Sequence, residues 1–179
     1  MNRFVRRLCL AALVIITTGS TAMSLDLENT LYLDLTYGRV VIELRPDLAP
    51  KHVARIKELA RQGFYNGIKF HRVIDGFMAQ TGDPRGDGTG GSGIKLAAEF
   101  SREAFQRGTL GMARARDPNS GDSQFFIVFA RAPHLDAQYT VWGKVVEGME
   151  LVDKIKRGEP PRDPDKIVKM QVAADAPKN

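Results

Sequence analysis

The chain consists of many short strand-like runs separated by glycines, and only two runs have a helical pattern. Leucines alternate with polar residues over residues 31–35, and a β-branched run over residues 40–44 follows a turn, which predicts a hairpin. Further strands are predicted near residues 68–74, 77–80, 94–100, 109–113, 124–129, 139–146 and 166–172. Because the helices are too far apart to alternate with strands, the pattern argues against a parallel α/β sheet and favours a closed β-barrel or a sandwich.

The two helical runs differ in length. The first is predicted to begin at Pro50, because proline suits the first turn of a helix, and to end at Gly63. The second covers residues 148–155 and ends near Gly158.

The first 22 residues have the three-part pattern of a secretory signal peptide. Three arginines form a basic start, residues 8–18 form an apolar run, and small residues follow it up to Ala22. We predict cleavage after Ala22, with Ser24 as the alternative. An uncleaved membrane anchor is also an alternative, although the apolar run is shorter than the roughly 20 residues that span a bilayer. The expected location is therefore the periplasm or outside the cell.

Removal of this segment changes the charge and the cysteine content. The 179-residue chain has 26 basic and 21 acidic residues, a formal net charge of +5. Loss of the three N-terminal arginines lowers it to +2, which leaves no strong footprint for nucleic acid or for a membrane surface. The single cysteine, Cys9, also lies in the signal, so the mature chain has no disulfide. We assign residues 23–172 to one domain and residues 173–179 to a flexible tail.

Two segments set polar side chains among large apolar ones. Arg72 and Gln80 stand among Phe, Val, Ile and Met residues, and Gln124 leads into an aromatic run. An arginine bracketed by apolar residues is usually either paired with an acid or held ready for a ligand. The residues leave both open, since Arg72 could form a structural ion pair with Asp75 or Asp83. The segments together predict an apolar groove with a few fixed hydrogen-bond donors.

Alternation along residues 124–129 separates two faces of a predicted strand. One face is entirely apolar and predicts core: Phe125, Ile127 and Phe129. The other face mixes an amide with an aromatic ring: Gln124, Phe126 and Val128. The mixed face suits the wall of a pocket, but Phe126 could equally be core, with Gln124 at its rim.

The sequence lacks the residues that phosphate binding, metal binding or covalent catalysis would need. The glycine-rich run over residues 82–93 has neither a phosphate-loop ending nor calcium-loop spacing, so it predicts a tight surface loop. His52, His71 and His134 form no metal-ligand pair, and we expect no metal and no other cofactor. No nucleophile elbow is present and no thiol remains after signal removal, so nothing predicts covalent catalysis.

With residues 70–83, 88–91 and 121–127 in this order, the sequence resembles the cyclophilin family of peptidyl-prolyl cis-trans isomerases over roughly residues 30–172. The resemblance implies a closed eight-stranded antiparallel β-barrel capped by two helices. Side chains fill such a barrel, so the substrate lies on an outer groove. It also implies an enzyme that accelerates rotation of X–Pro bonds in exported proteins as they fold. We expect a monomer that binds proline-containing segments and neither nucleic acid nor, after signal cleavage, a membrane.

The resemblance also implies roles by position. Arg72 would be the catalytic arginine, and Gln80 would orient it and bind the peptide backbone. The proline pocket would be lined by Phe77, Met78, Phe126 and Leu135. Further substrate contacts are implied for Gly88, Ala113, Arg114, Gln124, His134 and Tyr139.

Three positions depart from the best-known eukaryotic members. Arg114 replaces an asparagine, but contact there is largely through the backbone, so activity should persist. His134 replaces a tryptophan that hydrogen-bonds cyclosporin, so we expect weak cyclosporin binding. Tyr139 replaces a pocket histidine and keeps an aromatic wall with a polar tip.

The reaction breaks no bond and needs no acid–base pair. A donor aimed at the proline nitrogen binds the twisted amide better than either planar form, and the permanent charge of Arg72 suits that role. The alternatives are a proline-peptide-binding chaperone module with little or no turnover, a small-molecule carrier with a hollow barrel, and a nucleic-acid binder.

Overall fold

The structure, a computed structural model, describes residues 26–177 of the chain. The predicted signal peptide and its two candidate cleavage sites lie outside the described residues. The fold is mainly β, with eight antiparallel strands in one sheet of order β3-β4-β6-β5-β7-β2-β1-β8. The strands are β1 (Thr30–Leu35), β2 (Gly38–Leu44), β3 (Arg72–Ile74), β4 (Met78–Thr81), β5 (Thr109–Met112), β6 (Phe125–Val128), β7 (Val141–Glu147) and β8 (Lys169–Val172).

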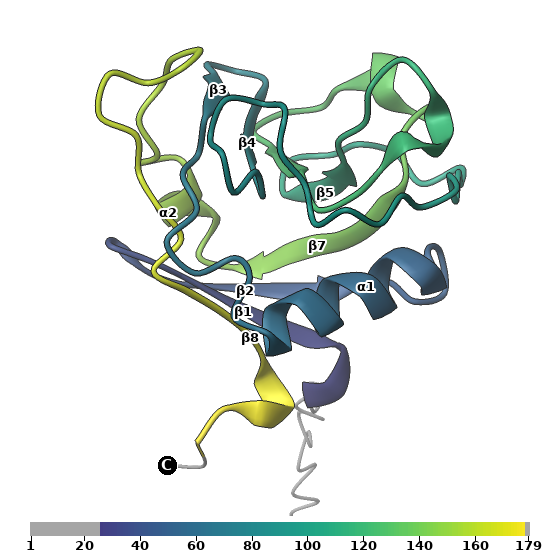
Figure 1. Cartoon of the computed structure of the whole chain (residues 1–179), viewed down its shortest axis with the longest axis horizontal. Helices are drawn as coiled ribbons and strands as arrows, with labels where there is room; N and C mark the ends of the chain where they lie inside the picture. The colour runs from purple at the N-terminus through teal and green to yellow at the C-terminus, as the bar shows by residue number, and fades with distance from the viewer. Residues whose placement is uncertain (1–25, 178–179) are drawn as a thin grey trace, which may run out of the picture.

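The sheet curls into a half-barrel with two helices, α1 (Pro50–Arg61) and α2 (Met149–Val152). Figure 1 shows β1, β2 and β8 beside α1 in the lower half, β3, β4 and β5 in the upper half, and β7 between them. In the described chain the edge strands β3 and β8 are not ladder partners, but a single bridge between Lys69 and Lys166 joins the segments that precede them. Four short 3-10 helices complete the described fold: η1 (Leu27–Asn29), η2 (Pro118–Ser120), η3 (Pro133–Leu135) and η4 (Ala173–Asp175).

Helix α1 begins at Pro50, as predicted, and a carboxylate from a distant segment caps it. Glu99 accepts hydrogen bonds from the backbone N–H groups of Lys51 at 3.1 Å and His52 at 3.0 Å. Its second contact with His52, at 2.6 Å from Nδ1, fixes the same turn of the helix. The orphan N–H groups that every helix start presents are therefore satisfied from outside the helix.

The strand predicted over residues 94–100 is wrong. This segment makes one isolated bridge, between Leu96 and Gly121. The backbone N–H groups of Ala98 and Glu99 donate to side-chain oxygens instead of to a neighbouring strand. Because its donors are satisfied in this way, the segment remains irregular although its composition resembles that of a strand.

Buried side chains fill the space between the sheet and α1. The largest fully buried ones in this main core include Trp142, Tyr65, Phe70 and Phe125. Along β6 the two faces divide as predicted, since the odd-numbered residues belong to the main core, whereas Phe126 and Val128 belong to a second cluster on the opposite face. An interior filled with side chains does not fit the hollow barrel that a small-molecule carrier needs.

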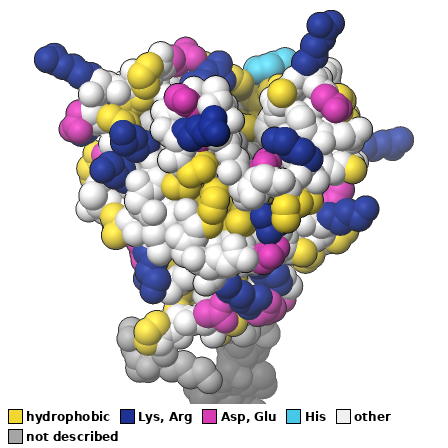
Figure 2. Space-filling view, in the orientation of Figure 1, with side chains coloured by type: hydrophobic (Ala, Val, Ile, Leu, Met, Phe, Trp, Pro, Cys, Tyr) yellow, Lys and Arg dark blue, Asp and Glu magenta, His cyan; other side chains and the backbone are white. Residues whose placement is uncertain are grey.

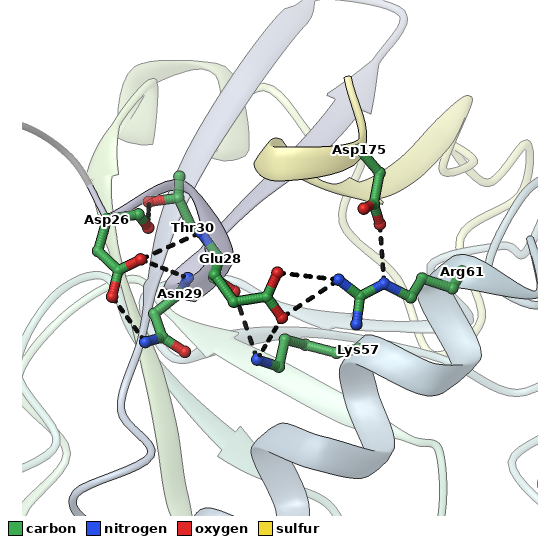
Figure 3. Close-up of polar contacts among 7 residues, drawn as sticks. All are labelled: Asp26, Glu28, Asn29, Thr30, Lys57, Arg61 and Asp175. Carbon is green, nitrogen blue, oxygen red and sulfur yellow. Dashed lines mark hydrogen bonds and ion pairs between the residues drawn. The ribbon is translucent and has the colours of Figure 1, made fainter. Parts of the chain in front are cut away.

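Both ends of the described chain are tied to α1 by ion pairs (Figure 3). Glu28 accepts hydrogen bonds from Lys57 at 2.9 Å and from Arg61 at 3.0 and 3.1 Å, and Arg61 also donates to Asp175 at 2.8 Å. Residues 173–175, which the sequence placed in the tail, form η4 and lie against η1 and β1.

The visible surface carries mixed charge. On the face seen in Figure 2, basic and acidic side chains are interspersed and neither sign gathers into a large patch. Of the helices in residues 26–177, none is long and apolar enough to cross a bilayer.

Candidate active site

A cavity of about 310 Å³ opens beside β3, β4 and β6 on the outer face of the sheet. It is lined by Arg72, Phe77, Met78, Gln80, Ala113, Arg114, Phe126, His134, Leu135 and Tyr139. Every one of these belongs to the set of site residues that the resemblance implied. The other two members of that set, Gly88 and Gln124, line a neighbouring hollow of about 370 Å³, which shares Gln80, Ala113 and Arg114 with the first.

Strand register places the central residues of this cavity in one row. Arg72 on β3 lies opposite Gln80 on β4, Gln80 lies opposite Phe126 on β6, and Phe126 lies opposite Gly111 on β5. Directly opposed residues of antiparallel strands point to the same face of the sheet. The guanidinium, the amide and the ring therefore lie side by side.

The row requires glycine at its β5 end. A Cβ on Gly111 would lie 2.4 Å from Cζ of Phe126 and 2.7 Å from Cε1 of Phe105. The bare backbone allows the ring of Phe105 to stack on Phe126 at a centroid distance of 5.8 Å, while Tyr139 meets Phe126 edge-on at 5.7 Å. Phe126 is thus part of a packed cluster and also a wall of the cavity. Sequence reasoning missed Gly111 and Phe105, because the partner strand of Phe126 is known only from the register.

A chain of side-chain amides connects the arginine to the glycine-rich loop. Nη1 of Arg72 lies 3.5 Å from Oε1 of Gln80, a long contact. Nε2 of Gln80 donates to Oε1 of Gln124 at 3.0 Å, and Nε2 of Gln124 donates to the carbonyls of Gly88 at 3.0 Å and Gly90 at 2.8 Å. The amides are therefore oriented by fixed backbone carbonyls at the far end.

The arginine also has an ion-pair partner, although not one of the two considered from the sequence. Nε of Arg72 donates to Oε2 of Glu159 at 2.7 Å. Asp75 pairs with Arg157 at 3.1 Å, and Asp83 accepts hydrogen bonds from loop backbone, so neither acid is the partner. Even with this pair, Arg72 remains a lining residue of the cavity. The ion pair with Glu159 therefore does not take Arg72 out of the cavity.

The glycine-rich loop is organised around a buried carboxylate. Asp83, 1% exposed, accepts hydrogen bonds from the backbone N–H groups of Arg85 at 2.7 Å, Asp87 at 3.1 Å and Gly88 at 2.6 Å. Burial alone would raise the pKa of Asp83, but the backbone donors outweigh it and hold the pKa below its ordinary value. Gly90 packs so closely that a Cβ there would lie 2.0 Å from Oδ1 of Asp83. The loop is the tight one that its glycines predicted.

The three residues that differ from the best-known eukaryotic cyclophilins lie at the cavity. The guanidinium of Arg114 lies over the ring of Tyr139 at 4.5 Å and donates to the carbonyls of Ala115 and Gln138, both at 3.1 Å. His134 lies against Phe77 with ring centroids 5.2 Å apart. The charge of Arg114 is therefore directed toward carbonyls, and Tyr139 is held as a wall.

The side chain directly before Arg72 in the chain, His71, adds no positive charge beside the guanidinium. Burial lowers the pKa of the neighbouring His71 below its ordinary value of 6.5, so the imidazole is neutral at pH 7 and does not repel the guanidinium. Within residues 26–177, no group of three or more His, Cys, Asp or Glu side chains is placed to hold a metal ion. What the cavity offers is a fixed cationic donor beside an apolar wall.

Comparison with known proteins agrees with this geometry. The family described as "Cyclophilin type peptidyl-prolyl cis-trans isomerase/CLD" matches residues 30–172. A relative from Brucella suis, described as a probable peptidyl-prolyl cis-trans isomerase, is 54% identical over 94% of this chain and 95% of its own length. The chain therefore belongs to the cyclophilin-type peptidyl-prolyl cis-trans isomerases, enzymes that interconvert the cis and trans forms of X–Pro bonds.

Solved structures show the same fold. A cyclophilin from Hirschia baltica matches with a TM-score of 0.78 and 30% identity, covering 85% of this chain and 76% of that one. A cyclophilin-type isomerase from Cryptosporidium parvum, solved in the presence of the dipeptide Ala-Pro, matches with a TM-score of 0.75 and 30% identity over 80% of this chain and 98% of that one.

Proposed function

We propose that Arg72 is the catalytic donor of this isomerase, and that the cavity beside it takes the proline ring of an X–Pro segment. The observation that carries the proposal is the cross-strand row Arg72, Gln80 and Phe126, which sets a guanidinium beside an apolar wall. The Cryptosporidium structure solved with Ala-Pro supports a proline-containing segment as the occupant.

The geometry accounts for acceleration without bond breaking. The X–Pro bond rotates over a barrier of roughly 20 kcal/mol, and rotation restores a lone pair on the proline nitrogen. Of the five N–H groups of Arg72, one donates to Glu159 and one contacts Gln80. The others are available to a twisted amide, which accepts more strongly than a planar one. The apolar wall lowers the local dielectric and so strengthens the donor.

The test is Arg72→Ala in a coupled isomerisation assay with a proline-limited reporter peptide. Loss of one preorganised donor typically costs about 10²–10³ in rate, so we expect kcat/KM to fall at least a hundredfold while the fold survives. Arg39→Ala is the matched control, because Arg39 is also half exposed and also pairs with an acid, Asp34. Wild-type turnover in folded Arg72→Ala would contradict the proposal. An inactive wild-type protein that still binds the peptide would favour the chaperone module.

The pattern of the N-terminal residues supports a second proposal, on where the protein acts. We propose that residues 1–22 direct export, that the mature protein acts on exported proteins as they fold, and that it is a monomer free of the membrane. Cell fractionation with mass measurement of the mature N-terminus tests export, and the expected first residue is Met23. A full-length cytoplasmic protein would contradict it. Light scattering on the purified protein measures its mass in solution and so tests whether it is a monomer.

A further inference from the structure

The strongest polar contact of Arg72 is with a residue that the sequence did not single out. Oε2 of Glu159 lies 2.7 Å from Nε of Arg72, whereas Oε1 of Gln80 lies 3.5 Å from Nη1. Among the ion pairs of residues 26–177, this is the one that Arg72 makes. A hydrogen bond on Nε restrains the plane of the guanidinium and leaves its Nη2 group free.

The fold places Glu159 there by strand register. Val73 and Gly158 form an antiparallel bridge in which each backbone N–H donates to the other's carbonyl at 2.8 Å. One step away in an antiparallel register, Arg72 faces Glu159. The row of the active site therefore extends by one member, from Phe126 through Gln80 and Arg72 to Glu159.

The segment that carries Glu159 is itself anchored. The guanidinium of Arg157 lies over the ring of Phe129 at 4.3 Å and pairs with Asp75 at 3.1 Å. Gly158 has a φ of +146°, and a Cβ there would lie 2.5 Å from Cα of Pro161, so the turn into Glu159 depends on glycine. The backbone that carries the carboxylate of Glu159 is therefore fixed in position.

Arg72 has room to move if this contact is lost. A hollow of about 610 Å³ is lined by Arg72, Glu159 and Pro160, together with His71 and glycines of the loop. Its lining lacks Phe77, Met78 and Phe126, the walls of the proline cavity. An arginine that enters this hollow would direct its N–H groups away from the apolar walls of the proline cavity, although the two hollows share Gln80 and Arg114.

We propose that Glu159 is a positioning residue, which holds the guanidinium of Arg72 at the mouth of the proline cavity. This inference rests on the proposed catalytic role of Arg72. The side chains of Arg72 and Glu159 are 43% and 50% exposed, so their pairing adds little to fold stability. Its effect is on the geometry of the donor, where small displacements are costly in rate.

The experiment compares three variants: Glu159→Ala, Glu159→Gln and Asp163→Ala. Two quantities are measured for each, kcat/KM and the NMR resonance of the Arg72 Nε–H group. This resonance is assigned by its loss in Arg72→Ala. Asp163 is the matched control, an acid of the same segment that pairs with Lys156 instead. We expect Glu159→Ala to lower kcat/KM roughly twofold to fivefold, the size of one partly exposed charged contact. Its Nε–H resonance should shift, and its unfolding midpoint should not change.

Glu159→Gln keeps an acceptor oxygen and should recover most of the activity, and Asp163→Ala should match the wild type in both measurements. The inference is overturned if Glu159→Ala keeps or exceeds wild-type kcat/KM, or if the Nε–H resonance does not move. A large loss in Arg72→Ala with no loss in Glu159→Ala would overturn this inference alone. An unimpaired Arg72→Ala would overturn the proposed catalytic role, and this inference with it.

Discussion

Two aromatic neighbours on β6 show how the two faces of the sheet differ. Phe125 is 0% exposed and meets Trp142 and Tyr65 edge-on, at centroid distances of 5.3 and 5.6 Å. Phe126 is 5% exposed and packs on Phe105 and Tyr139, but its open side faces the cavity. The inner ring is surrounded by protein, whereas the outer ring leaves one side for a ligand.

The comparison shows that stability and function depend on different kinds of contact here. The interior is held by apolar packing, which does not depend on pH. The outer face depends in addition on a polar framework, in which Asp83 holds the glycine-rich loop and Gln124 connects that loop to Gln80. Changes inside should therefore lower the free energy of unfolding at every pH. Changes outside should lower either activity or a part of the free energy of unfolding that depends on pH.

The largest effect on stability is expected from the inner ring. Phe125→Ala should lower the free energy of unfolding by about 3–5 kcal/mol, because a fully enclosed ring leaves a cavity. Chemical denaturation measures the loss, and kcat/KM per folded molecule should stay within about twofold of the wild type. If Phe125→Ala lost activity while its free energy of unfolding stayed unchanged, the inner and outer faces would not differ as proposed.

A smaller and pH-dependent effect is expected at Asp83. Because folding lowers the pKa of Asp83, its contribution to stability is complete above the ordinary value of 3.8 and is lost as pH falls through the lower folded value. Asp83→Asn sets an NH₂ group against backbone donors and should cost about 2 kcal/mol at pH 7.

Denaturation as a function of pH checks this prediction. The difference between wild type and Asp83→Asn should be constant near neutrality and shrink below pH 3.8. A difference that persists unchanged into strong acid would show that packing, and not the carboxylate, holds the loop.

The outer ring should mainly affect activity. Phe126→Ala removes one wall of the proline cavity and should lower kcat/KM about tenfold, which corresponds to about 1.4 kcal/mol of lost apolar contact. Its loss of stability should be smaller than that of Phe125→Ala, because one side of the ring is already open. Equal stability losses in the two variants would show that the faces do not differ as proposed.

The smallest effect is expected at the rim. His134→Trp adds an indole N–H donor where His134 lies against Phe77, and it should tighten cyclosporin binding roughly fivefold, the value of about one hydrogen bond. Isothermal titration measures the affinity, and isomerase activity should change little. Tight cyclosporin binding by the wild type would refute the prediction.

Local patterns predicted much of this fold. The hairpin of β1 and β2, the start of α1 at Pro50 and the two faces of β6 all follow from periodicity and from the preferences of single residues. The second helix is shorter than predicted and covers only Met149–Val152. The failure at residues 94–100 has another cause, because whether a run becomes a strand depends on a partner that periodicity does not identify.

The residues that line the site could be predicted, but the contacts that hold them in place could not. The resemblance supplied the residues that line the cavity, from Arg72 to Tyr139. It did not supply Gly111 or Phe105, which leave room for Phe126 and support it. Nor did it identify Glu159, which contacts Arg72 across a separation of 87 residues.

By itself, the sequence determined which faces are apolar and which side chains carry donors, because those properties are local to a few residues. The tertiary structure alone decided which donors meet which acceptors. Register between strands far apart in the chain opposes Arg72 to Gln80 and places Glu159 beside them, and register depends on packing the whole sheet at once.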